Sequence, residues 1–334
     1  MISSYKDFLY NEIIRMDNEI NIKTTHAYPN AIMSQSHTNM VFELDTTNFN
    51  LLGSSYLVFD LINLTNDNLS ITDLFDELTW TYNGIESNIS SEFILLLLDL
   101  HTDNQSTPAL HKLLKSNPLY LPIPLFFNSN KNSVYVQFQS IKFTIKNVNL
   151  SKVKTVKLLY DEILNKNFKN FKETEIPIEV FSMIKIPLVD SHKIQIPNNY
   201  LQELIWVYKN DFDKHNKYFH PVKSIGLNLI MNTQKNVLFF TERENTYFRY
   251  VTKYIAHTNS DNNNIYVYPF VLYPEIFTTE LTISEQCKFV ELVNIFDPDT
   301  TIDFDNKYIH ICIKSFCFVD LILGCNYQPY NNHI

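Results

Sequence analysis

Residues 263–275 read NNIYVYPFVLYPE, and the two prolines in this stretch limit the folds that the chain can adopt. The run from Ile265 to Tyr268 is β-branched or aromatic, which favours a β-strand. Pro269 cannot donate a backbone N–H to a neighbouring strand, yet the apolar residues continue until Pro274. Proline in a sheet is confined to edges, strand starts and bulges. The stretch therefore predicts a strand that bends or begins again, as strands do at the corners of sandwiches and barrels.

The composition indicates a large globular protein. Its 334 residues suffice for two domains or for one large β domain. Hydrophobic residues make up 45% and aromatic residues 14%, so the chain can bury a substantial core. The formal net charge of −9 argues against a general nucleic-acid binder, because phosphate neutralisation requires clustered Lys and Arg. We therefore expect no direct nucleic-acid binding.

The low glycine content and the spacing of the cysteines limit the kinds of binding site that the chain can form. With only 4 glycines the chain cannot build the usual phosphate-binding loops, and Asn-rich runs such as 128–132 and 262–264 are interpreted as turns. The opening residues lack the basic start and apolar block of a secretory signal, so we expect a soluble, cytosolic product. No CxxC pair occurs, which predicts reduced core thiols at Cys287, Cys312, Cys317 and Cys325.

Most of the chain beyond residue 40 is interpreted as short strands separated by polar turns. Asn83-Gly84 is a strong signal for a tight turn, and a change of alternation near Ser140 predicts a bulge or bend. The strand-like segments form two series, which favours two tandem β-sandwiches or barrels. They are 41–44, 56–62, 78–82, 134–138 and 141–145, and then 154–159, 179–186, 201–208, 223–231, 247–254, 265–272, 288–295 and 308–323.

Little helix is expected. Residues 5–20 could form a short amphipathic helix or an arm that packs only against a partner. Residues 93–100 could be a helix or a buried strand, because periodicity does not distinguish the two in a short apolar run. Short helices are predicted at 108–114 and at 161–171.

The sequence offers little support for catalysis. It contains no G-x-S-x-G, H-E-x-x-H, phosphate-loop or GxGxxG motif. His310 and Cys312 would share one strand face, but a single pair does not make a metal site. Acidic clusters could serve a glycosidase or hold calcium, although ordinary solvated loops explain them better. These clusters are Asp73, Asp76 and Glu77, and Asp297, Asp299, Asp303 and Asp305. We predict a protein that is not an enzyme, with no catalytic, cofactor or metal site.

Three stretches, taken in order, resemble one known family. The first is LYLPIPLFF at 119–127, followed by a predicted strand pair, and the second is LIWV at 204–207. The third spans 240–275 and contains FTER, Tyr-Phe, His-Thr and the IYVYPFVLYPE strand. Their order and spacing are similar to those of the double jelly-roll major capsid proteins of the nucleocytoplasmic large DNA virus, virophage and polinton-like lineage. The resemblance covers residues from about 40 to about 330.

The resemblance implies an all-β fold with two tandem eight-stranded antiparallel jelly rolls. It divides the chain into an N-terminal arm or short helix (1–25), a first jelly roll (26–150), a connecting segment (151–175) and a second jelly roll (176–334). In such a fold, the strand that contains Pro269 would lie where a sandwich bends or meets an edge.

The positions that match the family are expected to be structural markers. The sequence departs from the family pattern at Lys253, where the family usually has Pro, and at 277–280 and 283–284, which replace a Pro-Ser/Thr-Gly turn and an Asn-x-Ser. These departures leave open a diverged capsid protein, a minor capsid paralogue or a related scaffold. The matching positions are Leu121, Pro122, Pro124, Phe126, Phe127, Trp206, Arg243, Tyr247, Phe248, Tyr254, His257, Tyr266, Tyr268, Phe270, Pro274 and Glu275.

For function, the resemblance implies a structural viral capsid protein. It would assemble as a homotrimer whose six jelly rolls form a pseudo-hexameric capsomer of an icosahedral shell. Its partners would be itself, neighbouring capsomers, minor capsid or penton proteins and an internal membrane. Its location would be the virion capsid, after assembly in the host cytoplasm. Two alternatives stay open: a related scaffold or minor capsid protein that forms a lattice on a viral membrane, and a jelly-roll carbohydrate-binding protein or glycosidase, which the aromatic content would suit.

Overall fold

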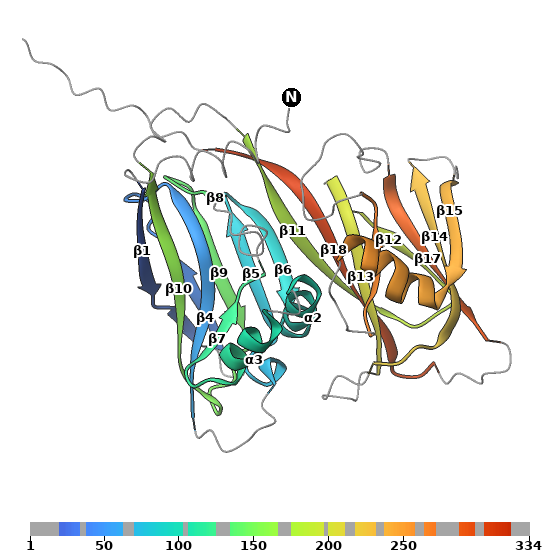
Figure 1. The fold of residues 1–334 in the computed structure, drawn as a ribbon, viewed down its shortest axis with the longest axis horizontal. Helices are drawn as coiled ribbons and strands as arrows, with labels where there is room; N and C mark the ends of the chain where they lie inside the picture. The colour runs from blue at the N-terminus through green and yellow to red at the C-terminus, as the bar shows by residue number, and fades with distance from the viewer. Residues whose placement is uncertain are drawn as a thin grey trace, which may run out of the picture.

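Two β-sandwiches lie side by side in the computed structural model of the chain (Figure 1). The long strands β11 (Glu175–Pro187) and β18 (Lys307–Asp320) belong to the second sandwich and extend along its side towards the first. The structure describes residues 20–33, 38–62, 70–102, 106–124, 134–165, 175–196, 200–210, 218–231, 237–257, 264–271, 287–297 and 304–321.

The first sandwich, called the first roll below, has two antiparallel sheets. One has the order β1-β10-β4-β7, with β8 also paired to β4, and the other has the order β2-β3-β9-β5-β6. The described helices in its connections are η1 (Ile71–Asp73), α2 (Ser91–His101) and α3 (Thr107–Lys115). Its strands are β1 (Ile20–Ala27), β2 (Asn30–Met33), β3 (Thr38–Glu43), β4 (Leu51–Leu61), β5 (Glu77–Tyr82), β6 (Ile85–Ser90), β7 (Leu119–Pro122), β8 (Val134–Tyr135), β9 (Ile141–Lys146) and β10 (Val153–Asn165).

The second sandwich, or second roll, has sheets β11-β18-β13-β16 and β12-β17-β14-β15. Besides β11 and β18, its strands are β12 (Ser191–Gln195), β13 (Tyr200–Asn210), β14 (Val222–Met231), β15 (Val237–Glu244), β16 (Tyr266–Pro269) and β17 (Cys287–Phe296). After β15 the chain forms a π-helical turn, η3 (Tyr247–Val251), and then helix α5 (Thr252–Ala256).

Both sandwiches have the same strand order. When the strand positions are numbered along the chain, one sheet of each sandwich runs 1-8-3-6 and the other runs 2-7-4-5. In the first roll, β2 and β3 together fill position two, and β7 and β8 fill position six. This interleaving of two four-stranded sheets is the jelly roll, which contains two Greek keys. The predicted fold, two tandem eight-stranded antiparallel jelly rolls, is therefore confirmed.

Several local predictions are confirmed as well. Asn83 and Gly84 have φ values of 47° and 86°, as the tight turn between β5 and β6 requires. The ambiguous residues 93–100 are helical. Ser90 caps α2 because its hydroxyl accepts the backbone N–H of Phe93 at 3.3 Å. The helix predicted at 108–114 corresponds to α3.

The proline-interrupted strand ends at the edge of a sheet. Strand β16 is the last strand of its sheet and lies beside β13, with Pro269 opposite Glu203. The chain then leaves the ladder, and the N–H of Phe270 donates to the carbonyl of Gln202 at 2.8 Å. A proline is tolerated here because an edge position does not require its missing N–H for a further strand. The bend predicted near Ser140 is a turn with Phe138 at φ 63° that carries the chain from β8 in one sheet to β9 in the other.

Other local predictions are wrong. Residues 247–254 were expected to be a strand, but they form η3 and the start of α5. Residues 161–165, expected to be helical, continue strand β10, where they pair with β1. The rest of that predicted helix lies outside the described residues, as does the N-terminal segment up to residue 19.

The strand bounds also bear on the domain limits. Strand β1 begins at Ile20, inside the predicted arm 1–25, and β10 covers 153–165 of the predicted connecting segment 151–175. Both strands pair within one sheet of the first roll. We therefore propose that the boundary between the two rolls lies between Asn165 and Glu175.

The hydrophobic core of the first roll continues into the second. In β13, Leu204 and Trp206 face the inside of the second roll, whereas Ile205 and Val207 join the core of the first. The sheet that contains β13 is thus buried on both faces. This double burial explains why its central sequence, LIWVY, is continuously apolar and does not alternate with polar residues.

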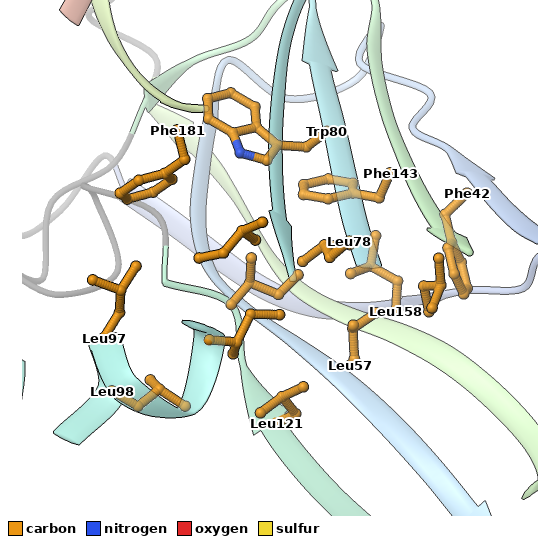
Figure 2. Packing of buried hydrophobic residues seen from close by; sticks show 14 of the residues in the cluster. Phe42, Leu57, Leu78, Trp80, Leu97, Leu98, Leu121, Phe143, Leu158 and Phe181 are labelled. Atoms are coloured by element: carbon orange, nitrogen blue, oxygen red, sulfur yellow. The ribbon is translucent and has the colours of Figure 1, made fainter. Parts of the chain in front are cut away.

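A phenylalanine from the second roll completes the first core. Figure 2 shows Phe181 of β11 in the same cluster as Trp80 of β5 and Leu97 of α2. Phe181 is 1% exposed. Removing such a side chain from water stabilises the protein by roughly 1.5–3 kcal/mol, so this packing fixes the second roll against the first.

Candidate functional site at the seam between the jelly rolls

The seam is the contact between β6 and α2 of the first roll and β11, β13 and β18 of the second. Strands β6 and β11 each lie at the edge of their own sheet. The hydroxyl of Ser87 accepts the backbone N–H of Phe181 at 2.8 Å, and the side-chain carbonyl of Asn88 accepts that of Met183 at 3.2 Å. Side-chain oxygens thus satisfy backbone donors of β11 that could otherwise pair with another strand.

A charged group crosses the seam. The carboxylate of Glu92, in the first turn of α2, lies 3.0 Å from Nζ of Lys209 on β13 and 3.6 Å from Nδ1 of His310 on β18. The side chains of Glu92 and Lys209 are only 8% and 14% exposed. Because water is largely excluded, this pair interacts more strongly than one on the surface.

The carboxylate of Glu92 is stabilised in its charged form. Burial is the largest influence on its pKa and raises it, but the hydrogen bonds and charges of His310 and Lys209 together lower it by more. The net effect is a pKa below the ordinary value of 4.5. The ion pair across the seam is therefore present at neutral pH.

A second ionic group lies deeper in the seam. Nζ of Lys314 on β18 is 3.2 Å from Oε2 of Glu179 on β11, and both side chains are fully buried or nearly so. Glu203 on β13 is the direct register partner of Lys314. Its Oε1 lies 2.6 Å from Nε2 of His257, which in turn lies beside His101 of α2, with ring centroids 5.2 Å apart. Polar groups therefore extend from β11 to α2.

Many of the predicted motif residues come together in an aromatic cluster inside the second roll. Trp206 stacks on Tyr266 at 5.6 Å between ring centroids and packs against Phe248 at 5.7 Å. Tyr266 also meets Tyr208 edge-on at 5.0 Å. Tyr268, at 5.9 Å from Phe248, extends the cluster, and Tyr247 and Phe270 continue it. Such pairs add about 0.5–1.5 kcal/mol each beyond their buried area.

The remaining motif residues of the second roll do not join the cluster. His257 is buried and bonded to Glu203, so it belongs to the seam. Arg243 is exposed and lies over the ring of Tyr247, with 5.9 Å from Cζ to the ring centroid. Tyr254 is 71% exposed. The helical turns of η3 and α5 thus separate motif residues that face inward from those that face outward.

The motif residues of the first roll lie elsewhere. Leu121 is buried in the first core opposite Leu57 (Figure 2), and Pro122 ends strand β7 at the edge of its sheet. Pro124 is buried just after that strand. The predicted positions Phe126, Phe127, Pro274 and Glu275 lie outside the described residues. The described motif positions therefore do not form one site: most of them pack inside the two rolls, His257 lies in the seam, and Arg243 and Tyr254 are exposed.

A histidine contacts the aromatic cluster from its polar side. Nδ1 of His220 lies 2.9 Å from the hydroxyl of Tyr266. Burial, and to a smaller extent the positive charge of Arg249, lowers the pKa of His220 from 6.5 to about 4. The imidazole is therefore neutral at pH 7, and its Nδ1 can accept a hydrogen bond from the hydroxyl of Tyr266.

This lowered pKa predicts a specific pH dependence. Between pH 6.5 and about 4 the unfolded chain binds a proton at His220 that the folded chain does not bind. The stability that His220 contributes is thus complete above pH 6.5 and is lost as the pH falls towards 4. The variant His220→Gln, which cannot titrate, is expected to lose less stability over this range. Urea unfolding at several pH values measures the difference, and parallel curves for the two proteins would contradict the assignment.

The first acidic cluster is occupied by structural contacts. Glu77 lies 2.6 Å from Nζ of Lys146, and Asp73 lies 3.0 Å from Nζ of Lys152. Asp76 accepts a hydrogen bond from the side chain of Asn147 at 2.7 Å. Asp73 lies in η1 and Glu77 begins strand β5, so only part of this cluster lies in a loop, and all three carboxylates are engaged in structural contacts.

The described residues bear only in part on the second acidic cluster, on metal binding and on the cysteines. Asp299 and Asp303 of the second acidic cluster lie outside the described residues. Across the described ranges, no group of three His, Cys, Asp or Glu side chains is arranged to hold a metal ion. Cys312 and Cys317 are buried free thiols, and burial raises the pKa of Cys317 to about 11. No helix in the described part of the chain is long and apolar enough to cross a bilayer.

Sequence reasoning missed the ionic groups of the seam. A signal for them was present, because Glu203 and Lys209 flank the apolar centre of β13, and His310 and Lys314 alternate with isoleucines in β18. Charged residues at alternate positions of an apolar strand would ordinarily indicate a solvated face. Here that face is covered by the first roll, which only the tertiary structure reveals.

Two jelly rolls in tandem, joined by a buried seam, place the chain among double jelly-roll proteins. VP54 of PBCV-1 aligns with a TM-score of 0.67 and 13% identity, over 91% of this chain and 95% of VP54. A chain of the PBCV-1 virus capsid aligns with a TM-score of 0.64 and 12% identity, over 91% and 95% of the two chains. The Faustovirus major capsid protein aligns with a TM-score of 0.62 and 6% identity, over 91% of each chain.

These alignments cover both rolls and their relative placement, so they extend beyond the likeness of one jelly roll to another. At such low identity they establish the fold. No protein-family model matches the sequence, and no curated protein matches it significantly.

Proposed function

We propose that this chain is a structural capsid protein that assembles as homotrimers into an icosahedral shell. The observation that carries the proposal is the pair of jelly rolls held in one fixed arrangement by a buried seam. Alignment over almost the whole length of viral capsid chains supports it. The sequence resemblance, which rests on different evidence, points to the same class.

The seam supports the proposal for a physical reason. Three copies of a two-roll chain around a threefold axis present six similar sandwiches and a nearly hexagonal outline. Such an outline tiles a shell only if the two rolls of each chain keep one relative position. The buried Phe181, the ion pair of Glu92 and Lys209, and the side-chain bond of Ser87 all oppose movement between them.

The proposal also specifies the binding partners of the protein and where it assembles. We expect contacts with neighbouring capsomers, with minor capsid or penton proteins and with an internal membrane, in virions assembled in the host cytoplasm. We expect no enzymatic activity, and the structural engagement of Asp73, Asp76 and Glu77 supports this. The net charge of −9 supports a shell protein that does not bind the genome directly.

The experiment measures the mass of the purified full-length chain by light scattering after size exclusion, followed by negative-stain imaging. The expected result is a species of three 39.4 kDa chains with hexagonal outlines. A monomer at every concentration, in solution and on lipid vesicles, would contradict the proposal.

Two other outcomes would redirect the assignment. A hexagonal lattice that forms only on vesicles, and that is absent from purified virions, would favour the scaffold alternative. Binding or hydrolysis in a sugar screen by a monomeric protein would favour the carbohydrate alternative.

A further inference from the structure

A fully buried lysine lies between two carboxylates in the seam. Lys314 is on β18, which is flanked in its sheet by β11 and β13. On β13 its direct register partner is Glu203, and on β11 its register partner is Phe181, two residues from Glu179. Residues at directly opposed positions in a sheet point to the same face. Both acids and the lysine therefore share the face that is turned towards the first roll.

The distances bring one acid into contact with the lysine. Nζ of Lys314 is 3.2 Å from Oε2 of Glu179, with side-chain exposures of 0% and 2%. The aromatic ring of Phe181 and the thiol of Cys312 are also buried on this face, as members of the first core. This contact with a carboxylate oxygen holds the amine next to the carboxyl group that it would attack, and groups held together away from solvent have effective concentrations far above those of free groups.

The other acid, Glu203, lies opposite Lys314 in the sheet and is held by a histidine. Oε1 of Glu203 lies 2.6 Å from Nε2 of His257. Its Oε2 is buried and has no hydrogen-bond partner among the described residues. His257 thus fixes one oxygen of the Glu203 carboxyl group and leaves the other without a hydrogen bond, on the sheet face that Glu203 shares with Lys314.

We propose that Lys314 and Glu179 form an intramolecular isopeptide bond that covalently joins β18 to β11. The ammonium of Lys314 first gives one proton to the carboxylate of Glu179. The neutral Nζ then attacks Cδ of Glu179, a C–N bond forms, and the C–O bond to the protonated oxygen breaks. The ammonium and the carboxylate together supply the atoms of one released water molecule. Glu203 takes a proton from the attacking nitrogen and returns it to the leaving oxygen, so no oxidant, reductant or cofactor is required.

Burial supplies the driving force. A carboxylate and an ammonium are costly to hold in a water-poor interior, whereas the amide that replaces them is neutral. Release of water from the site also favours condensation. The inference concerns the seam alone and does not depend on the proposed capsid role.

The test is the intact mass of the purified full-length chain after denaturation, followed by peptide mapping. The expected mass is lower than the sequence mass by one water molecule, and a branched peptide contains both Lys314 and Glu179. A full sequence mass, with the two residues recovered in separate linear peptides from freshly purified and from aged protein, would overturn the proposal.

Three variants make the test specific. Lys314→Met removes the nucleophile and is expected to have its full sequence mass. Glu203→Gln keeps both reacting groups but cannot shuttle the proton, so the branched peptide is expected to disappear. In Glu179→Gln the same amide would form with loss of ammonia, and the product would have the mass of the cross-linked wild type. A branched peptide that persists unchanged in Glu203→Gln would remove Glu203 from the proposed step.

The chain contains a matched internal control. Lys146 and Glu77 are closer, at 2.6 Å, but their side chains are 40% and 30% exposed. Because water competes for both groups, no branched peptide is expected there. A cross-link at Lys146 in place of Lys314 would show that burial is not the determining factor.

Discussion

The variant Glu92→Ala is expected to lose about 3–5 kcal/mol of its free energy of unfolding, because Lys209 would keep its buried charge without the carboxylate. Lys209 is 14% exposed and lies 3.0 Å from Glu92 in the folded protein. The variant also removes the acidic residue from the first turn of α2, where it interacts favourably with the helix dipole. Urea unfolding followed by circular dichroism measures the loss.

Two comparisons separate the buried pair from charge in general. Glu43→Ala breaks a pair that is exposed and 4.0 Å long, and it is expected to cost about 0–1 kcal/mol. The double variant Glu92→Met, Lys209→Met replaces both charges by apolar groups and is expected to recover most of the stability. Equal losses in Glu92→Ala and Glu43→Ala would contradict a buried ionic contact in the seam.

The stability that the ion pair of Glu92 and Lys209 contributes depends on pH. Because the folded protein lowers the pKa of Glu92, the stability that this group contributes is complete above its ordinary value of 4.5. It is lost as the pH falls below that value towards the lowered pKa of the folded state. The difference in stability between wild type and Glu92→Ala should therefore shrink in acid.

The variant Phe181→Ala is expected to lose about 3–5 kcal/mol, the usual cost of removing a buried aromatic ring and leaving a cavity. Phe181 is 1% exposed and is one of the residues of β11 that pack in the core of the first roll (Figure 2). The cavity would lie at the seam, so the variant should have a lower free energy of unfolding and a looser contact between the rolls. Denaturant unfolding measures the free energy, and amide hydrogen exchange in β6 and β11 measures the looser contact.

A control variant on the neighbouring strand β18 tests the prediction for Phe181→Ala. Phe318 of β18 is 37% exposed, and Phe318→Ala is expected to cost less than about 1 kcal/mol because water already reaches its ring. A loss below 1 kcal/mol in Phe181→Ala, or faster exchange confined to the second roll, would contradict the role of Phe181 in joining the rolls.

The sequence predicted the strands well because their signals are local. Alternating or continuously apolar runs bounded by polar turns located β5, β13, β14, β17 and β18 to within a few residues. The tight turn at Asn83-Gly84 was also readable, because only residues that tolerate positive φ suit it. Pro269 indicated a bend or an edge, and it lies at the end of the edge strand β16, where the strand predicted over 265–272 stops.

Local signals failed where tertiary packing decides. Residues 247–254 are rich in tyrosine and valine, which favours a strand, yet they form η3 and α5. Their helical form lets Phe248 reach Trp206 inside the second roll. The Leu-rich run 93–100 was ambiguous because its local pattern fits a helix and a buried strand equally well. Its environment at the seam and the cap at Ser90 select the helix.

The sequence by itself determined the class of fold and the strands, because hydrophobic periodicity and turn residues act over a few positions of the chain. The resemblance also identified positions such as Trp206 and Tyr266, which the structure brings into one aromatic cluster. Only the tertiary structure decided the seam. Whether Glu203 and Lys314 face water or a second roll depends on where a distant part of the chain packs, and a one-dimensional pattern does not contain that information.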